Sequence, residues 1–309
     1  MSSWLVRGPG IVIVGAAAFL SGCMTSVRTA LPPAAKDAIT STAITIGLAQ
    51  TEIGTDIVES NAGAASSSSG GVAASIIGGV IDASIDKARA RDAEAAVAPL
   101  RKAMVGYDAR TPLQAAFHRV FTGNSGPLTF QNVDIAPAID ATTGRKIVDS
   151  ATTDAVLIVR LDHRFTPSFS QIRIDATATL YDRKASLATN SPEKLTVLYS
   201  NKFVLLADRP AARGYSSYVA YWAQDNAARL RETLSTSFQE IAEMIAFDLP
   251  AGVEANRPRK ETLETSVKGA EIPGKAGSEI EIKGTVVRTQ PTGRKWIRLA
   301  NGALSSVRK

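Results

Sequence analysis

Apolar residues in the middle of the chain recur with the two-residue period of β-strands. Segment 171–181 alternates strictly between apolar and polar positions, which predicts a strand with one face on a core and the other in water. Segment 154–161 is apolar almost throughout and indicates a central strand covered on both faces. Segments 127–135 and 195–206 are also predicted to be strands, and the second forms a long hairpin with 171–181.

Helical spacing of apolar residues flanks these strands. Thr111 is a suitable N-cap for a predicted helix over 112–121. The longest predicted helix is capped by Ser216 or Ser217 and runs to about Phe247, before a proline and a glycine that end it. Its apolar stripe follows three- and four-residue steps and consists of Val219, Trp222, Leu230, Leu234, Phe238, Ile241 and Ile245.

These elements predict an α+β fold. We expect a mostly antiparallel sheet of about four to five strands, covered by a long C-terminal helix, plus a small C-terminal β-ribbon. Segment 41–49 fits both a helix and a strand, and its content of threonine, isoleucine and glycine favours the strand. The main domain is expected to span 41–250 and to include a glycine-rich helical segment over 70–98.

The C-terminal region is predicted to be a separate ribbon module. Segment 251–277 is rich in proline and charge and is most simply a linker. Segment 278–309 contains strand-like positions, and Asn301-Gly302 predicts a type I′ hairpin turn. Because a ribbon of about 30 residues cannot hold a core alone, we expect it to dock on the main domain or on a partner.

The N-terminal residues have the layout of a secretory signal. Arg7 supplies one positive charge, residues 8–19 are uncharged and mostly apolar, and small residues precede Cys23. The apolar stretch is shorter than the ~20 residues of a membrane-spanning helix. The motif Leu20-Ser21-Gly22-Cys23 resembles the lipobox of bacterial lipoproteins.

The lipobox resemblance implies that the signal peptide, 1–22, is cut before Cys23 and that this cysteine then carries fatty acyl chains such as palmitate. The mature chain would begin with a lipidated tether over 23–40. Met24 stands where, by the same resemblance, aspartate would favour the inner membrane, so we expect the outer membrane of a Gram-negative envelope, on its periplasmic face. The alternative is an ordinary signal peptide that is cut elsewhere.

Charge is distributed unevenly along the chain. The net charge is +6, and the last 59 residues contain 12 basic and 6 acidic residues. This excess predicts an anionic partner, such as lipid headgroups, lipopolysaccharide or an acidic envelope protein, and nucleic acid is not expected in the periplasm. Solvated strand faces are the alternative interpretation of the same charges. The candidate binding residues are Lys283, Arg288, Arg294, Lys295, Trp296 and Arg298.

Small residues recur every fourth position near the start of the glycine-rich segment. Gly71, Ser75 and Gly79 would share one helix face, which resembles a glycine zipper, a motif that lets helices pack closely. Such a helix could dip into a membrane or form a homo-oligomer. Small side chains bury too little apolar area to drive insertion strongly, so packing on its own domain or on a second copy is the alternative.

Few residues have the spacing of known catalytic or metal sites. His163 follows Asp162 at the end of a strand and His118 lies on a predicted helix, but no spacing typical of metal ligands joins them. Segment 269–276 imitates a phosphate-binding loop without the hydroxyl that holds magnesium. The single cysteine leaves no disulfide once it is acylated. We therefore expect no cofactor, no metal and no enzymatic activity.

The order of the central elements resembles the small α+β domain of several envelope lipoproteins. These include penicillin-binding-protein activators and the amino-terminal domain of the Tol-system propeller protein, and the resemblance rests on segments 153–158, 176–182 and 198–200. It implies a non-enzymatic accessory, assembly or binding factor anchored through Cys23. A self-assembling membrane-associated protein is the second hypothesis, and a hydrolase built from scattered serine and aspartate residues is the third.

Overall fold

The computed structural model describes residues 27–48, 53–55, 98–122, 128–166, 168–189, 194–211, 214–251, 264–272 and 275–308. The predicted lipidation site Cys23 and the predicted zipper positions Gly71, Ser75 and Gly79 lie outside these ranges. Within them, no helix is both long and apolar enough to cross a bilayer.

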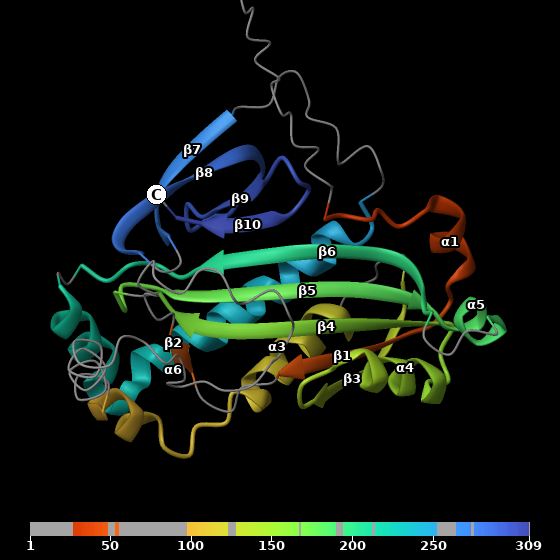
Figure 1. The fold of residues 1–309 in the computed structure, drawn as a ribbon, viewed down its shortest axis with the longest axis horizontal. Coiled ribbons are helices and arrows are strands. Elements are labelled where there is room, and N and C mark those ends of the chain that lie inside the picture. The colour runs from red at the N-terminus through yellow and green to blue at the C-terminus, as the bar shows by residue number, and fades with distance from the viewer. Residues whose placement is uncertain are drawn as a thin grey trace, which may run out of the picture.

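The described elements form an α+β fold around one sheet (Figure 1). The helices are α1 (Pro33–Ala38), α3 (Arg110–Thr122), α4 (Ala141–Ser150), α5 (Arg183–Ala188) and α6 (Tyr215–Asp248). The strands are β1 (Thr42–Leu48), β2 (Gly54–Thr55), β3 (Phe130–Ala136), β4 (Ala155–Phe165), β5 (Ile172–Asp182), β6 (Thr196–Leu206), β7 (Glu264–Ile272), β8 (Lys275–Thr289), β9 (Lys295–Arg298) and β10 (Leu304–Val307).

The sheet is larger than predicted and mixed in direction. It has ten strands in the order β3-β1-β4-β5-β6-β10-β9-β8-β7, with β2 paired to β4. Strand β1 pairs in parallel with both β3 and β4, and β10 pairs in parallel with β6. The expected number of four to five strands is therefore wrong, although antiparallel pairings still outnumber parallel ones. The prediction missed strands because the C-terminal region, expected to be a separate module, extends the same sheet through β10.

Strand β4 is central, as its continuous apolar run predicts. Leu157 and Val159 face the main core, whereas Val156 and Ile158 belong to a smaller cluster with Val148 of α4. All four side chains are buried. The alternation of β5 is also confirmed over its first half, and the hairpin of β5 with β6 forms as predicted.

Helices α4 and α5 occupy segments without a predicted helix. Helix α4 begins after Asp140, whose carboxylate accepts a hydrogen bond from the Thr143 amide at 2.7 Å. Helix α5 begins after Asp182, whose carboxylate accepts from the Ala185 amide at 2.9 Å. Both aspartates are ordinary N-caps, and α4 and α5 are ten and six residues long, respectively, too short for a clear apolar stripe.

The predicted single long helix is interrupted. Within α6 the backbone leaves the helical region from Gln224 to Ala227, and Asp225, Asn226 and Ala227 have positive φ. The predicted stripe has a gap at this point, between Trp222 and Leu230. Because four strands follow α6, it is also not the C-terminal element. The second half nevertheless buries the predicted stripe completely, with Leu230, Leu234, Phe238, Ile241 and Ile245 against the sheet.

The C-terminal strands continue the main sheet. Strand β7 lies in the segment predicted to be a linker and pairs with β8. Between β9 and β10, only Gly302 has a positive φ, and its amide donates to the Leu299 carbonyl at 2.9 Å. The expected type I′ turn needs positive φ at two successive residues, so the hairpin forms with a different turn.

Candidate functional site

The six predicted binding residues do not share one exposed surface. Trp296 is 0% exposed and Arg294 and Arg298 are each 7% exposed, whereas Lys283 and Arg288 are exposed and Lys295 is intermediate. Trp296 packs edge-on against Phe247 of α6 and is covered from outside by Arg288, whose guanidinium lies 4.7 Å from the ring centroid. The indole is therefore not a surface anchor, and the three buried side chains belong to two polar networks beneath the C-terminal strands.

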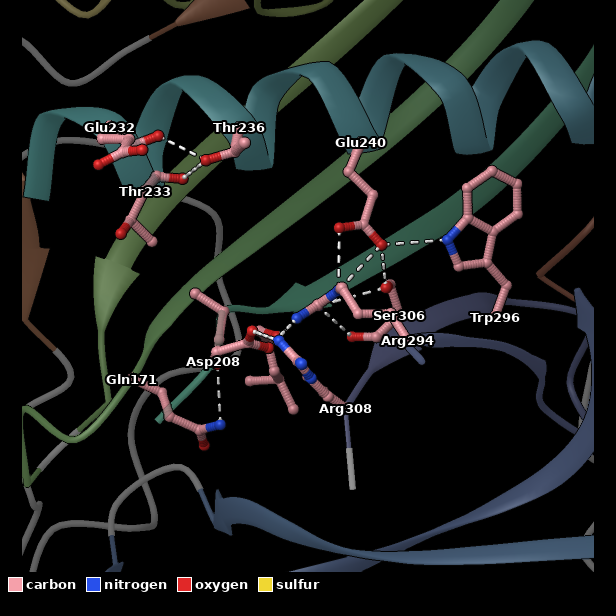
Figure 2. A network of polar contacts seen from close by, with 12 residues as sticks. Gln171, Asp208, Glu232, Thr233, Thr236, Glu240, Arg294, Trp296, Ser306 and Arg308 are labelled. Atoms are coloured by element: carbon pink, nitrogen blue, oxygen red, sulfur yellow. Dashed lines mark hydrogen bonds and ion pairs between the residues drawn. The ribbon is translucent and has the colours of Figure 1, made fainter. Parts of the chain in front are cut away.

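The first network surrounds Glu240 on α6 (Figure 2). Arg294 donates from Nε to this carboxylate at 3.0 Å, and Trp296 donates from its indole nitrogen at 3.1 Å. Ser306 of β10 donates its hydroxyl to the same carboxylate. One glutamate thus fixes β9 and β10 to the helix below them, and we call this cluster the Glu240 network.

Arg294 extends the Glu240 network toward solvent. Its Nη1 lies 2.5 Å from Asp208, and its Nη2 donates to the Leu206 carbonyl at 2.6 Å. Arg308 pairs with the other oxygen of Asp208 at 2.6 Å. The Asp208 side chain is 45% exposed, so this outer part is a surface ion pair, whereas the part at Glu240 is shielded from water.

The second network surrounds Asp248, which is 0% exposed at the end of α6. Tyr199 and Asn201, both buried in β6, donate to its carboxylate at 2.7 and 2.8 Å. Arg28 donates from Nε at 3.1 Å, and Arg298 donates from Nη2. These five residues, the Asp248 network, join the N-terminal segment, the central sheet, the long helix and the C-terminal hairpin at one buried point.

Two buried guanidinium groups, those of Arg28 and Arg298, share the carboxylate of Asp248. Backbone carbonyls accept further donors: Arg28 reaches Ala251 at 2.5 Å and Arg298 reaches Gly302 at 3.1 Å. Burial by itself raises the pKa of Asp248, but Arg298 and Arg28 outweigh it and hold that pKa below its ordinary value. Burial and the adjacent carboxylate raise the pKa of Tyr199 well above 10. The network is therefore ionised at Asp248 and neutral at Tyr199 near pH 7.

The segment that carries Arg28 is fixed by its backbone as well. The Val27 amide donates to the Asn301 carbonyl at 2.9 Å, in the β9–β10 turn. Thr29 and Ser200 exchange two backbone hydrogen bonds, at 2.7 and 3.1 Å, as an antiparallel bridge on β6. Residues 27–29 are thus part of the fold. No local signal in the sequence marks Arg28, because its partner lies 220 residues away.

The structure places the neighbouring His163 and Asp162 side chains on opposite faces of β4. His163 points into the core, with its ring 5.9 Å from that of Phe238, and burial lowers its pKa to about 4. Asp162 is on the other face of β4, paired with Arg164 at 3.0 Å, and burial raises its pKa. The two side chains therefore cannot work together on one substrate, and His163 is neutral at physiological pH.

The other histidine is on a different element. His118 is exposed on α3, with its Nδ1 3.2 Å from the Thr122 hydroxyl. Among the residues that the structure describes, no group of three or more histidine, cysteine or acidic side chains could hold a metal ion.

The predicted outward face of segment 171–181 carries Arg173 and Asp175. These two residues form a charged ladder with Arg164 and Asp162 of β4. Arg173 holds Asp175 through two hydrogen bonds of 2.7 Å, and Arg164 bridges Asp175 and Asp162 at 3.0 Å each. These side chains are partly exposed, and their charges balance within the ladder. Such a surface ion-pair network offers no net charge to an ionic partner.

Comparison with known proteins yields few similarities. No protein-family model and no curated protein matches the chain. Two solved PelC dodecamers from Paraburkholderia phytofirmans are similar to it. One is 12% identical, covering 72% of this chain and 96% of that chain, with a TM-score of 0.26. The other is 15% identical, covering 68% and 96%, with a TM-score of 0.21. At these TM-scores the likeness carries no argument about assembly or function.

Proposed function

We propose that this protein is a non-enzymatic accessory or assembly factor of the bacterial envelope, held on the outer membrane by acyl chains on Cys23. The observation that supports it most strongly is the burial of Arg28, five residues after the lipobox cysteine. Val27 and Thr29 beside it are bonded to the β9–β10 turn and to β6. A globule built in this way stays next to its anchor.

The chemistry of the buried polar groups supports a scaffold. Glu240 and Asp248 stabilise contacts between elements, and His163 packs against Phe238 with its pKa lowered to about 4. A general acid or base works best with a pKa near the working pH and access to substrate, and the buried His163 has neither. Turnover of an envelope substrate by the pure protein, lost on replacement of His163 or Asp162, would contradict the proposal.

The exposed basic residues of β8 are the proposed contact for an anionic envelope component or an acidic envelope protein. Of the six predicted residues, Lys283 and Arg288 are the exposed ones, and both lie on this strand. Deleting the ribbon cannot test them, because Trp296 and β10 belong to the core. Point substitutions can, since they remove charge without removing buried area.

The matching experiment is affinity capture of the acylated protein from membranes. We expect Lys283→Gln combined with Arg288→Gln to weaken retention of the captured partner, and more strongly at low salt, because exposed charges are screened as ionic strength rises. The control is Lys102→Gln combined with Lys146→Gln, which removes the same charge from exposed positions elsewhere. Equal retention by both double variants would exclude β8 as the contact.

A further inference from the structure

The route of the chain from Cys23 into the fold limits how the globule can lie on a membrane. Val27 is bonded to Asn301, and Thr29 to Ser200, so the chain is fixed to the sheet at these residues. Figure 1 shows the start of the described chain, in red, next to the β9–β10 hairpin. Four residue steps separate Cys23 from Val27, and a fully extended chain covers at most about 14 Å in that length.

That span exceeds the thickness of one polar headgroup layer by less than about 10 Å. The polar headgroup layer on one side of a bilayer is about 5–8 Å thick. If the acyl chains of Cys23 are in the hydrocarbon, Val27 can lie no more than roughly 9 Å beyond the headgroups. Asn301, which accepts the Val27 amide at 2.9 Å, is then within a few water layers of the lipid.

We infer that the edge formed by residues 27–29, the β9–β10 turn and the adjoining part of β8 faces phospholipid headgroups. This inference rests on the proposed lipidation of Cys23. We call it the membrane-facing edge. Ala300 is exposed within the β9–β10 turn. Arg298, the last residue of β9 before this turn, pairs with Thr285 of β8, which is two residues from Lys283. The exposed Lys283 thus lies at this edge, where a positive charge is attracted to anionic headgroups.

The sheet order places the edge strand β3 away from the anchored residues. Between β6, which carries the Thr29 bridge, and the far edge strand β3 there are four strand steps, through β5, β4 and β1. At about 4.8 Å per step, β3 is roughly 19 Å farther from the anchor. The exposed Asn132 on β3 is therefore a suitable reference position in the same sheet.

Fluorescence quenching in lipid vesicles tests this orientation directly. The full acylated chain has one cysteine, and acylation blocks it, so Ala300→Cys and Asn132→Cys each add a single reactive thiol. Each variant is labelled with a small fluorophore and reconstituted in vesicles whose phospholipid headgroups carry a nitroxide quencher. We expect quenching at position 300 to be at least about threefold stronger than at position 132, given the difference in reach.

A second variant tests whether the short connection to Cys23 causes the stronger quenching at position 300. Insertion of 20 glycine and serine residues after Ser26 leaves Arg28 and its contacts in place, while the root-mean-square length of the flexible segment rises to about 27 Å. We expect quenching at position 300 to fall to the level at 132. Equal quenching at the two positions in the native-length chain would overturn the orientation. If mass spectrometry shows Cys23 unacylated, the proposed function itself fails, so the two failures are distinguishable.

Discussion

Replacing Asp248 by asparagine should destabilise the protein severely, although the two side chains have nearly the same shape. The substitution removes the buried carboxylate that Arg28 and Arg298 share. Removing one partner of a buried, hydrogen-bonded ion pair typically costs about 3–5 kcal/mol. The total stability of a folded domain is about 5–15 kcal/mol, so this single change removes a large part of it.

The magnitude can be measured by urea and thermal unfolding. After removal of the signal, Trp222 and Trp296 are the two remaining tryptophans, and both are buried, so their fluorescence reports loss of the core. For a domain of this size, 3–5 kcal/mol corresponds to a fall in Tm of about 6–20 °C. Because the pKa of Asp248 is lowered below 3.8, its contribution is present above that pH and is lost only as pH falls through the lowered pKa. The penalty should therefore be constant at pH 5 and above.

Two further variants show whether charge imbalance is the cause. Asp208→Asn is the matched control, because Asp208 also pairs with two arginines but is 45% exposed, and we expect a loss of at most about 1 kcal/mol. Arg298→Met should cost less than Asp248→Asn, since Arg28 and Asp248 remain paired. A loss below about 1 kcal/mol for Asp248→Asn, or an equal loss for Arg298→Met, would refute the reasoning.

Other predictions concern pH, strand pairing and helix geometry. Burial lowers the pKa of His163 from 6.5 to about 4, so stability should be unaffected by this group above pH 6.5 and should fall by about 3 kcal/mol as pH drops to 4. His163→Leu should flatten this dependence when unfolding is measured as a function of pH. An unchanged slope would contradict the burial of the imidazole. A β-carbon on Gly284 would lie 2.2 Å from the Arg298 carbonyl oxygen, so Gly284→Ala should lower the free energy of unfolding by about 1–3 kcal/mol. It should also speed amide hydrogen exchange in β8 and β9. Exchange as slow as in the native protein would exclude this close approach. Asp225→Gly should stabilise the α6 break by about 1 kcal/mol, because glycine adopts positive φ without strain, and destabilisation would indicate that the break is absent.

Strands were the most predictable part of the fold, because burial on one or both faces leaves a direct mark on the sequence. The alternation of 171–181 and the apolar run at 154–161 correspond to β5 and β4. Features that depend on single residues were less visible. The break in α6 is marked only by a gap in its stripe between Trp222 and Leu230, and α4 only by the cap at Asp140.

The polar networks were the least predictable part. Arg294 and Arg298 stand in a locally basic run, which favoured an exposed binding surface. They are buried because Glu240 and Asp248 stand on the helix beneath them. One signal was available: Asp248 continues the three- and four-residue spacing of Ile241 and Ile245, which places a carboxylate on the buried face of a helix. Its partner Arg28 carries no such mark, since a contact across 220 residues leaves no local pattern.

The most direct test of the account is the mass of the N-terminal peptide of the native protein isolated from membranes. The account predicts a peptide that begins at Cys23 and carries acyl chains, with Cys23→Ala moving the protein out of the membrane fraction. A peptide with unmodified Cys23, or an unchanged distribution of the Cys23→Ala variant, would contradict it.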